Sequence, residues 1–292
     1  MSESVIADFV ATFDSDTLRR PEPVTGRILL SEKRLVLAVG DGDKLTIPLS
    51  SILDIAVGHV PEELSGFFQS TVTVAFERGN SRNVVVVEAD DDTIEKFSTV
   101  LFKALLNGTQ MTIKHPARVG GRVTSAAFEP AKLLLKPQQV VFETGNDRIT
   151  ISLSTVTEFS RSTRDITGNQ RPVLEVRHMP GAESMLTMAA TDSPRKMSIL
   201  GRYLRLEYSE LLAELEELEV NRDEKEILVA IYSGAGTEGI SLSQIVDTDP
   251  SKVTMMLNRL EKDELVVDAS DGTKLTPKGQ VLVSKHLEDV NV

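Results

Sequence analysis

Cysteine and tryptophan are both absent from the 292 residues of this chain. Without cysteine the protein has no disulfide, no thiolate metal site and no cysteine nucleophile, which favours a cytoplasmic protein. The sequence also lacks a run of eighteen apolar residues, so we expect no membrane-spanning helix. Residues 1–5 have neither a basic flank nor an apolar core, and we expect no signal peptide.

Positive charge is the minority sign, with 32 basic against 44 acidic side chains and a formal net charge of −12. This balance opposes general binding to nucleic acid. The charge is unevenly distributed, because residues 111–206 carry 14 basic and 8 acidic side chains, whereas residues 207–221 carry six acidic and none basic. Two interpretations remain open: the basic middle docks onto the acidic ends of the same molecule, or it receives an acidic partner.

A similar pattern of residues occurs twice, about a hundred residues apart. Residues 35–52 and 140–156 each contain a short apolar run, a turn with Gly, Asp or Asn, and a second alternating run that ends in Ser-Ser-Ile or Ser-Thr-Val. Similarity at such a period indicates a duplicated module. The repeated positions hold no nucleophile, metal ligand or phosphate-binding loop. The duplication therefore predicts a non-catalytic interaction protein, not an enzyme.

The sequence around each copy predicts antiparallel strands followed by one amphipathic helix. In a first module, 1–110, alternating residues predict strands from residue 24 onward, and Asp90, Asp91 and Asp92 then begin a helix. A metal site is the alternative interpretation of these aspartates. A second module, 111–220, ends in a long helix from about Pro194. The predicted fold is α+β multidomain, with two tandem pleckstrin-homology or GRAM-like β-barrel modules, each closed by a helix.

Residues 221–292 follow a different pattern, with three helices, a hairpin and a terminal helix. This order predicts a winged helix-turn-helix. Its third helix would offer Lys252, Asn258 and Arg259 to DNA, but neighbouring acidic residues oppose phosphate binding. We therefore favour a protein docking or dimerisation surface, which leaves a homo-oligomer open, and we keep a winged-helix transcriptional regulator as the alternative function.

Several short motifs could indicate chemistry, but their contexts do not support it. Residues 234–239 match G-x-G-x-x-G but follow a helix, so we expect a flexible loop. Ser193 and Lys196 match S-x-x-K without companion motifs, which favours a helix entry. We predict no catalytic, metal-binding or cofactor-binding residue and no cofactor. The four histidines are far apart in sequence and are expected at the surface or in loops: His59, His115, His178 and His286.

Four arginines surround the segment 162–170, which we expect to be a long loop between strands. Arginine prefers carboxylate or phosphate partners, so this segment is a candidate contact surface for an acidic protein. A solvated loop and a lipid headgroup site are the alternatives. The candidate partner-binding residues are Arg161, Arg164, Arg171 and Arg177, together with Lys252 and Arg259.

Residues 1–10, Met-Ser-Glu-Ser-Val-Ile-Ala-Asp-Phe-Val, and residues 26–31, Gly-Arg-Ile-Leu-Leu-Ser, resemble the archaeal taxis protein family CheF. The resemblance extends over the whole chain. It implies a non-catalytic chemotaxis adaptor that binds the response regulator CheY, preferentially phosphorylated, together with the CheC and CheD proteins. It also implies a relay to accessory proteins of the archaellum motor, and recruitment to the cytoplasmic base of the archaellum.

Overall fold

The structure is a computed structural model that describes residues 4–18, 22–40, 42–58, 70–166, 168–180, 183–234, 242–269 and 272–290. Contacts divide the chain into two compact units. One unit contains residues 1–110, 132–135 and 191–206, and the other contains residues 111–131, 136–190 and 207–292. None of the described helices is both long and apolar enough to cross a membrane.

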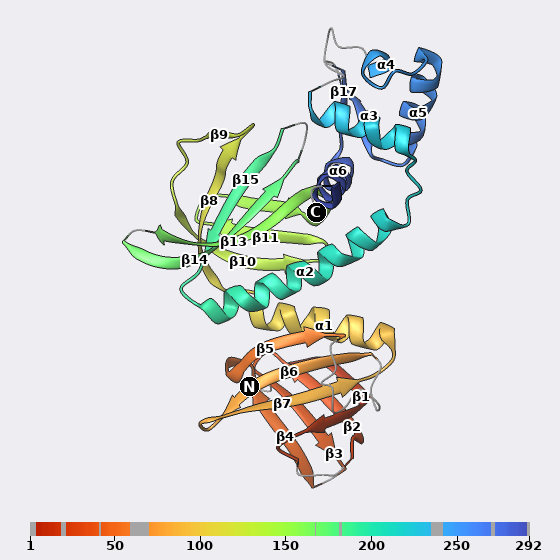
Figure 1. Cartoon of the computed structure of the whole chain (residues 1–292). Helices are drawn as coiled ribbons and strands as arrows, with labels where there is room; N and C mark the ends of the chain where they lie inside the picture. The colour runs from red at the N-terminus through yellow and green to blue at the C-terminus, as the bar shows by residue number, and fades with distance from the viewer. Residues whose placement is uncertain are drawn as a thin grey trace. The chain divides into compact units, whose positions relative to one another are not determined.

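The first large sheet has seven strands among the described residues, in the order β4-β3-β2-β1-β7-β6-β5 (Figure 1). Neighbouring strands run antiparallel. The short 3₁₀ helix η1 (Leu49–Ser51) joins β4 to β5. The strands are β1 (Val5–Ser15), β2 (Val24–Ser31), β3 (Arg34–Val39), β4 (Asp43–Pro48), β5 (Ile52–Val57), β6 (Thr71–Arg78) and β7 (Ser81–Glu88).

Helix α1 (Asp91–Leu106) packs on the first sheet through its apolar face. Asp90 caps this helix, since its carboxylate accepts a hydrogen bond from the backbone nitrogen of Thr93 at 3.0 Å. The predicted helix start is therefore confirmed. The ring of Phe97 lies 5.0 Å from the ring of Phe9 on β1, and Phe97 itself is almost fully buried. This aromatic pair fixes the helix against the sheet.

The second large sheet repeats the order of the first, as β12-β11-β10-β8-β15-β14-β13, with β9 paired to β8. A 3₁₀ helix, η3 (Leu153–Thr155), again lies between the two edge strands, so the repeat at 35–52 and 140–156 occupies equivalent places. The strands are β8 (Gln110–Val119), β9 (Arg122–Val123), β10 (Glu129–Lys136), β11 (Gln139–Thr144), β12 (Arg148–Ser152), β13 (Val156–Ile166), β14 (Asn169–His178) and β15 (Met185–Ala190).

The remaining elements are mostly helical. Helix α2 (Pro194–Glu216) begins where predicted, and Ser193 caps it by accepting a hydrogen bond from the backbone nitrogen of Lys196 at 3.2 Å. After it come α3 (Arg222–Tyr232), α4 (Leu242–Ile245), α5 (Pro250–Lys262), the hairpin β16 (Val266–Ala269) and β17 (Gly272–Leu275), and α6 (Pro277–Val290). Their apolar side chains form one buried cluster, which includes Ile227, Met256 and Leu260.

The structure corrects two predictions about the strands. Each large sheet is an open path among the described strands, so the predicted closed barrels are not found. The edge strands β4 and β5 are consecutive in sequence, but η1 separates them and they form no hairpin. The predicted loop at 162–170 is also wrong, because β13 and β14 continue through most of it and pair from Val156 to Ile166.

The predicted domain boundaries near residues 110 and 220 stay a prediction, because the contact division gives two units and not three. Residues 235–239 of the glycine-rich segment lie outside the described residues, and His59 lies outside them as well.

Candidate functional site

The register of β13 and β14 separates the four candidate arginines. Directly opposite residues of an antiparallel pair lie on the same face, and neighbours along a strand alternate. Arg164 lies opposite Arg171, and Arg177 lies opposite Glu158, so these three arginines share one face. Arg161 lies opposite Leu174 and is on the other face. The predicted cluster is therefore not a single patch.

Two arginines on the shared face are already paired with carboxylates. Arg164 donates to one oxygen of Glu175 from Nε at 2.8 Å and from Nη2 at 2.6 Å, and Ser162 donates to the same oxygen at 2.6 Å. Burial raises the pKa of Glu175, but these hydrogen bonds and the charges of Arg164 and Arg118 hold it below its usual value. Arg177 donates to Glu158 at 3.0 Å. Internal pairing thus offsets part of the positive charge.

The other two candidate residues, Lys252 and Arg259, lie together in an open hollow of about 470 Å³ between α3 and α5. On α5 they occupy one helix face with Met255 and Met256, at the i, i+3, i+4 and i+7 spacing. Met256 is buried in the cluster beneath, whereas Met255 is 65% exposed. The hollow therefore presents an unburied apolar side chain between two cations.

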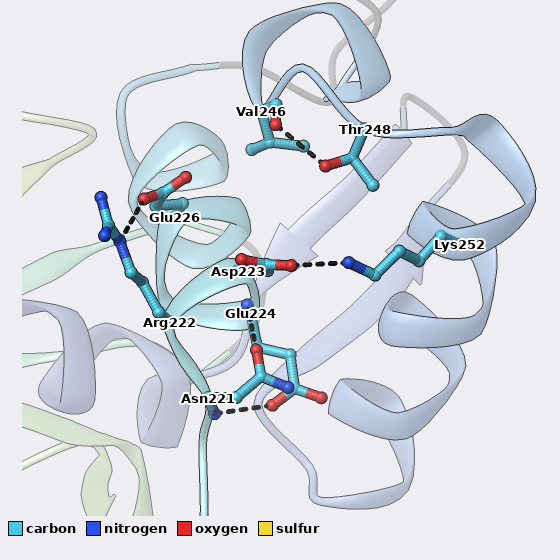
Figure 2. Close-up of polar contacts among 8 residues, drawn as sticks. All are labelled: Asn221, Arg222, Asp223, Glu224, Glu226, Val246, Thr248 and Lys252. Carbon is cyan, nitrogen blue, oxygen red and sulfur yellow. Dashed lines mark hydrogen bonds and ion pairs between the residues drawn. The ribbon is translucent and has the colours of Figure 1, made fainter.

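The wall of the hollow on α3 is built by a capping box. Asn221 accepts a hydrogen bond from the backbone nitrogen of Glu224 at 3.0 Å, and Glu224 accepts one from the backbone nitrogen of Asn221 at 2.9 Å (Figure 2). Lys252 crosses from α5 to bind Asp223 at 2.7 Å. This contact lowers the pKa of Asp223, so the carboxylate stays ionised.

Arg259 contacts the same wall of the hollow, at Glu224 and at the segment before α3. Its guanidinium lies 3.4 Å from the buried carboxylate of Glu224 and donates to the backbone oxygen of Glu219 at 2.9 Å. Both cations are thus held in place by α3 and the segment before it. The arrangement suits recognition of another surface, because charge pairs surround the exposed Met255.

Two histidines that the sequence placed at the surface or in loops are brought together inside the second sheet. His115 Nδ1 and His178 Nε2 lie 2.8 Å and 3.0 Å from the hydroxyl of Thr187, and their rings stack at 5.8 Å. His178 is 3% exposed, so the surface prediction is wrong for it. Burial and the neighbouring His115 lower the pKa of His178 to about 4, and burial lowers the pKa of His115.

The two imidazoles share one hydrogen-bond partner, the hydroxyl of Thr187. Within the described residues, no group of three or more His, Cys, Asp or Glu side chains is arranged to hold a metal ion. Thr187, which both imidazoles contact, is fully buried. No local signal in the sequence identifies the pair, because His115 and His178 belong to strands that only the intervening β15 brings close.

Comparisons with known proteins find relatives over nearly the whole chain. Two relatives from Halobacterium salinarum match: Taxis protein CheF2, 45% identical over all of both chains, and Taxis protein CheF1, 29% identical over 99% of both chains. Among solved structures, a Vav1 complex with an allosteric inhibitor aligns at 14% identity over 47% of this chain and 33% of that chain. Its TM-score is 0.28, too low to support a fold argument. The family model described as archaeal chemotaxis signal transduction system protein F matches residues 5–210, and this chain belongs to that family, CheF.

Proposed function

We propose that this protein is a non-catalytic chemotaxis adaptor that binds the response regulator CheY, preferentially phosphorylated, together with CheC and CheD proteins. It would relay the signal to accessory proteins of the archaellum motor at the cytoplasmic base of the archaellum. Family membership supports the taxis role. The binding partners and the relay to the motor go beyond family membership and are the content of this proposal.

The observation that carries the binding role is the exposed Met255 between Lys252 and Arg259. Protein interfaces are enriched in methionine and arginine, and their central contacts are surrounded by residues that exclude water. The charge pairs of Lys252 with Asp223 and of Arg259 with Glu224 supply such a surround. Preformed pairs also hold both long side chains in place before binding, which lowers the entropy cost of association.

The same pairs argue against the alternative of a transcriptional regulator. A DNA-binding helix neutralises several phosphates with free cations. On α5 the two candidate cations already face Asp223 and Glu224. We infer that the C-terminal helices and hairpin, which have the element order of a winged helix, serve protein docking. The two sheet modules have the strand-and-helix order expected of pleckstrin-homology-like modules, and we propose them as its scaffold.

Titration calorimetry with purified archaeal CheY, with and without a phosphoryl mimic, tests this function. We expect micromolar or tighter binding that strengthens with the mimic. Met255→Ser should weaken it about tenfold, because a central apolar contact is lost. Val267→Ser is the matched control, since Val267 is also exposed, at 46%, but does not line the hollow. Absence of binding in both states would refute the proposal.

The arginines of β13 and β14 remain a second proposed contact surface. Arg161 and Arg164 lie on opposite faces of the hairpin, so reversing each charge separately distinguishes the faces. We expect Arg164→Glu to weaken binding of phosphorylated CheY several-fold if the face with Arg171 and Arg177 makes contact. Unchanged affinity in both single variants would remove the hairpin from the binding surface.

A further inference from the structure

A second hollow, also of about 470 Å³, lies on the second sheet and contains none of the residues of the α3–α5 hollow. It is bounded by β8, the short strand β9 and the end of β13. Its wall includes Arg164 but otherwise consists of residues that the candidate surfaces do not use. This hollow has an apolar floor and a charged rim, which together suggest a specific kind of ligand.

The floor is a small buried cluster separate from the cluster of the C-terminal helices. Ala117, Ile166 and Met188 are each at most 8% exposed and pack with Val173, Leu186 and Ala190. Phe128 packs against this cluster and lines the hollow. The floor therefore offers an apolar surface to a large side chain.

The segment after β8 forms one wall of the hollow beside this floor. Gly120 and Gly121 have positive φ values of 53° and 80°, and they turn the chain back so that β9 pairs with β8. The backbone nitrogen of Thr124 then donates to the oxygen of Ala117 at 3.2 Å. Val123 is left 69% exposed at the edge of the hollow. The turn thus fixes one wall and leaves an apolar side chain in solvent.

The rim carries three cations and one carboxylate. Of the cations, Arg164 is bound to Glu175. The side chain of Lys114 makes no ion pair or hydrogen bond within the described parts of the chain, and Arg118 acts on Glu175 only through its charge. The carboxylate of Asp165 accepts a hydrogen bond from the backbone nitrogen of Gly168 at 2.7 Å. Lys114 and Arg118 are therefore available for an added negative charge.

We propose that this hollow binds an acidic peptide segment of a partner protein, with carboxylates on Lys114 and Arg118 and a large apolar side chain on the floor. Pockets for small molecules usually enclose most of their ligand. Here Arg118, Val123 and Arg164 are exposed, so a small ligand would stay largely in water, whereas a peptide extends along the open rim. Positive charge beside an apolar surface complements an acidic segment that contains an apolar residue.

This inference deepens the proposed function, because it rests on the second sheet module as a surface for acidic partners. The test uses the full chain and fluorescence anisotropy of labelled synthetic peptides. One peptide has a phenylalanine between glutamate pairs, a second has serine in place of the phenylalanine, and a third has glutamines in place of the glutamates. Inorganic phosphate is the competitor.

We expect saturable binding of the first peptide, at least tenfold weaker binding of the glutamine peptide, and at least threefold weaker binding of the serine peptide. Arg118→Glu should weaken binding at least tenfold. The matched control is Arg122→Glu, which reverses an exposed charge four residues away on β9, outside the lining of the hollow. It should change affinity less than twofold.

Equal losses from Arg118→Glu and Arg122→Glu would overturn the inference, because the attraction would then be diffuse. If the serine peptide bound with the same affinity as the phenylalanine peptide, the apolar floor would have no role in binding. Displacement by phosphate at an affinity similar to that of the peptide would indicate a small-anion site, and no peptide binding would refute the site. A CheY titration separates the two proposals: if CheY binds and the peptides do not, the adaptor function stands and this inference fails.

Discussion

The buried pair of histidines predicts that stability depends on pH in a window that can be stated in advance. Protonation of His178 requires a charge at a site that is 3% exposed, beside the stacked ring of His115. It also adds a second N–H to an imidazole whose buried Nδ1 has no hydrogen-bond partner among the described residues. Each effect disfavours the charged form in the folded protein, which explains why the pKa of His178 falls to about 4.

The size of the effect follows from proton linkage. The unfolded chain binds the proton with a pKa near 6.5, whereas the folded chain binds it only near 4. Above pH 6.5 both states are neutral, and the contribution of His178 to stability is complete. As the pH falls from 6.5 toward 4, the unfolded state gains protons first and stability declines, by about 2 kcal/mol at pH 5 and at most about 3 kcal/mol at lower pH.

Two measurements on the full chain test this reasoning. Nuclear magnetic resonance should show the ring protons of His178 titrating with a midpoint near 4 in the folded protein. Urea unfolding gives the free energy of unfolding at pH 7.5 and at pH 5. His178→Gln should reduce the difference between these two free energies by about 2 kcal/mol. A titration midpoint of His178 near 6.5 would show that burial does not disfavour the charged imidazole. The same conclusion would follow if the free energy of unfolding changed with pH equally in the wild type and the variant.

Two further predictions concern packing and capping, and thermal unfolding of the full chain checks both. Gly279→Ala should destabilise by about 2 kcal/mol or more, because the new Cβ would lie 2.0 Å from the backbone oxygen of Leu265. Gly201→Ala is its control in open helical space and should stabilise by up to about 1 kcal/mol. Asn221→Ala should cost about 1 kcal/mol by removing the cap on Glu224, and an unchanged melting temperature would contradict the role of the capping box.

Local chemistry made the helix starts and several strands predictable. Asp90 and Asp249 each accept a hydrogen bond from the first turn of the helix they begin, and Pro250 follows directly in α5. The strands predicted from residue 24 onward begin at that residue in the structure, with β2 (Val24–Ser31). In these segments each residue's own backbone preference and hydrogen bonding agree with the tertiary fold, so the sequence pattern was sufficient.

The missed strands show where such patterns mislead. Strand β1 is absent from the predicted strands, although Ala11 and Phe13 alternate with the polar Thr12 and Asp14 along it. The period of two is present in this part of the sequence and is sufficient to indicate a strand. Strand β8 is different, because it includes Lys114, His115 and Pro116 and alternates poorly. Pairing with β15, β10 and β9 makes that segment a strand.

The candidate arginines do not share one face of the sheet, and the sequence alone does not show this, because strand pairing decides the face of each residue. Arg161 and Arg164 are three residues apart, and a loop would have allowed both to face one partner. In a strand, an odd separation puts them on opposite faces. The face of each arginine depends on β13 continuing to Ile166, and that depends on its ladder with β14. Pairing with Glu158 and Glu175 depends on the same register.

The two sheets share a strand order and differ in what surrounds it, and this difference places the second hollow. In the second sheet, the Gly120–Gly121 turn adds β9 beside β8, which has no counterpart among the described strands of the first sheet. The turn brings Val123 and Phe128 over the floor that Ile166 helps to form. A duplicated scaffold thus retains its core pairing while one short addition creates a new surface. Partner specificity in such a protein is therefore expected to lie in the segments between the repeated strands rather than in the repeat itself.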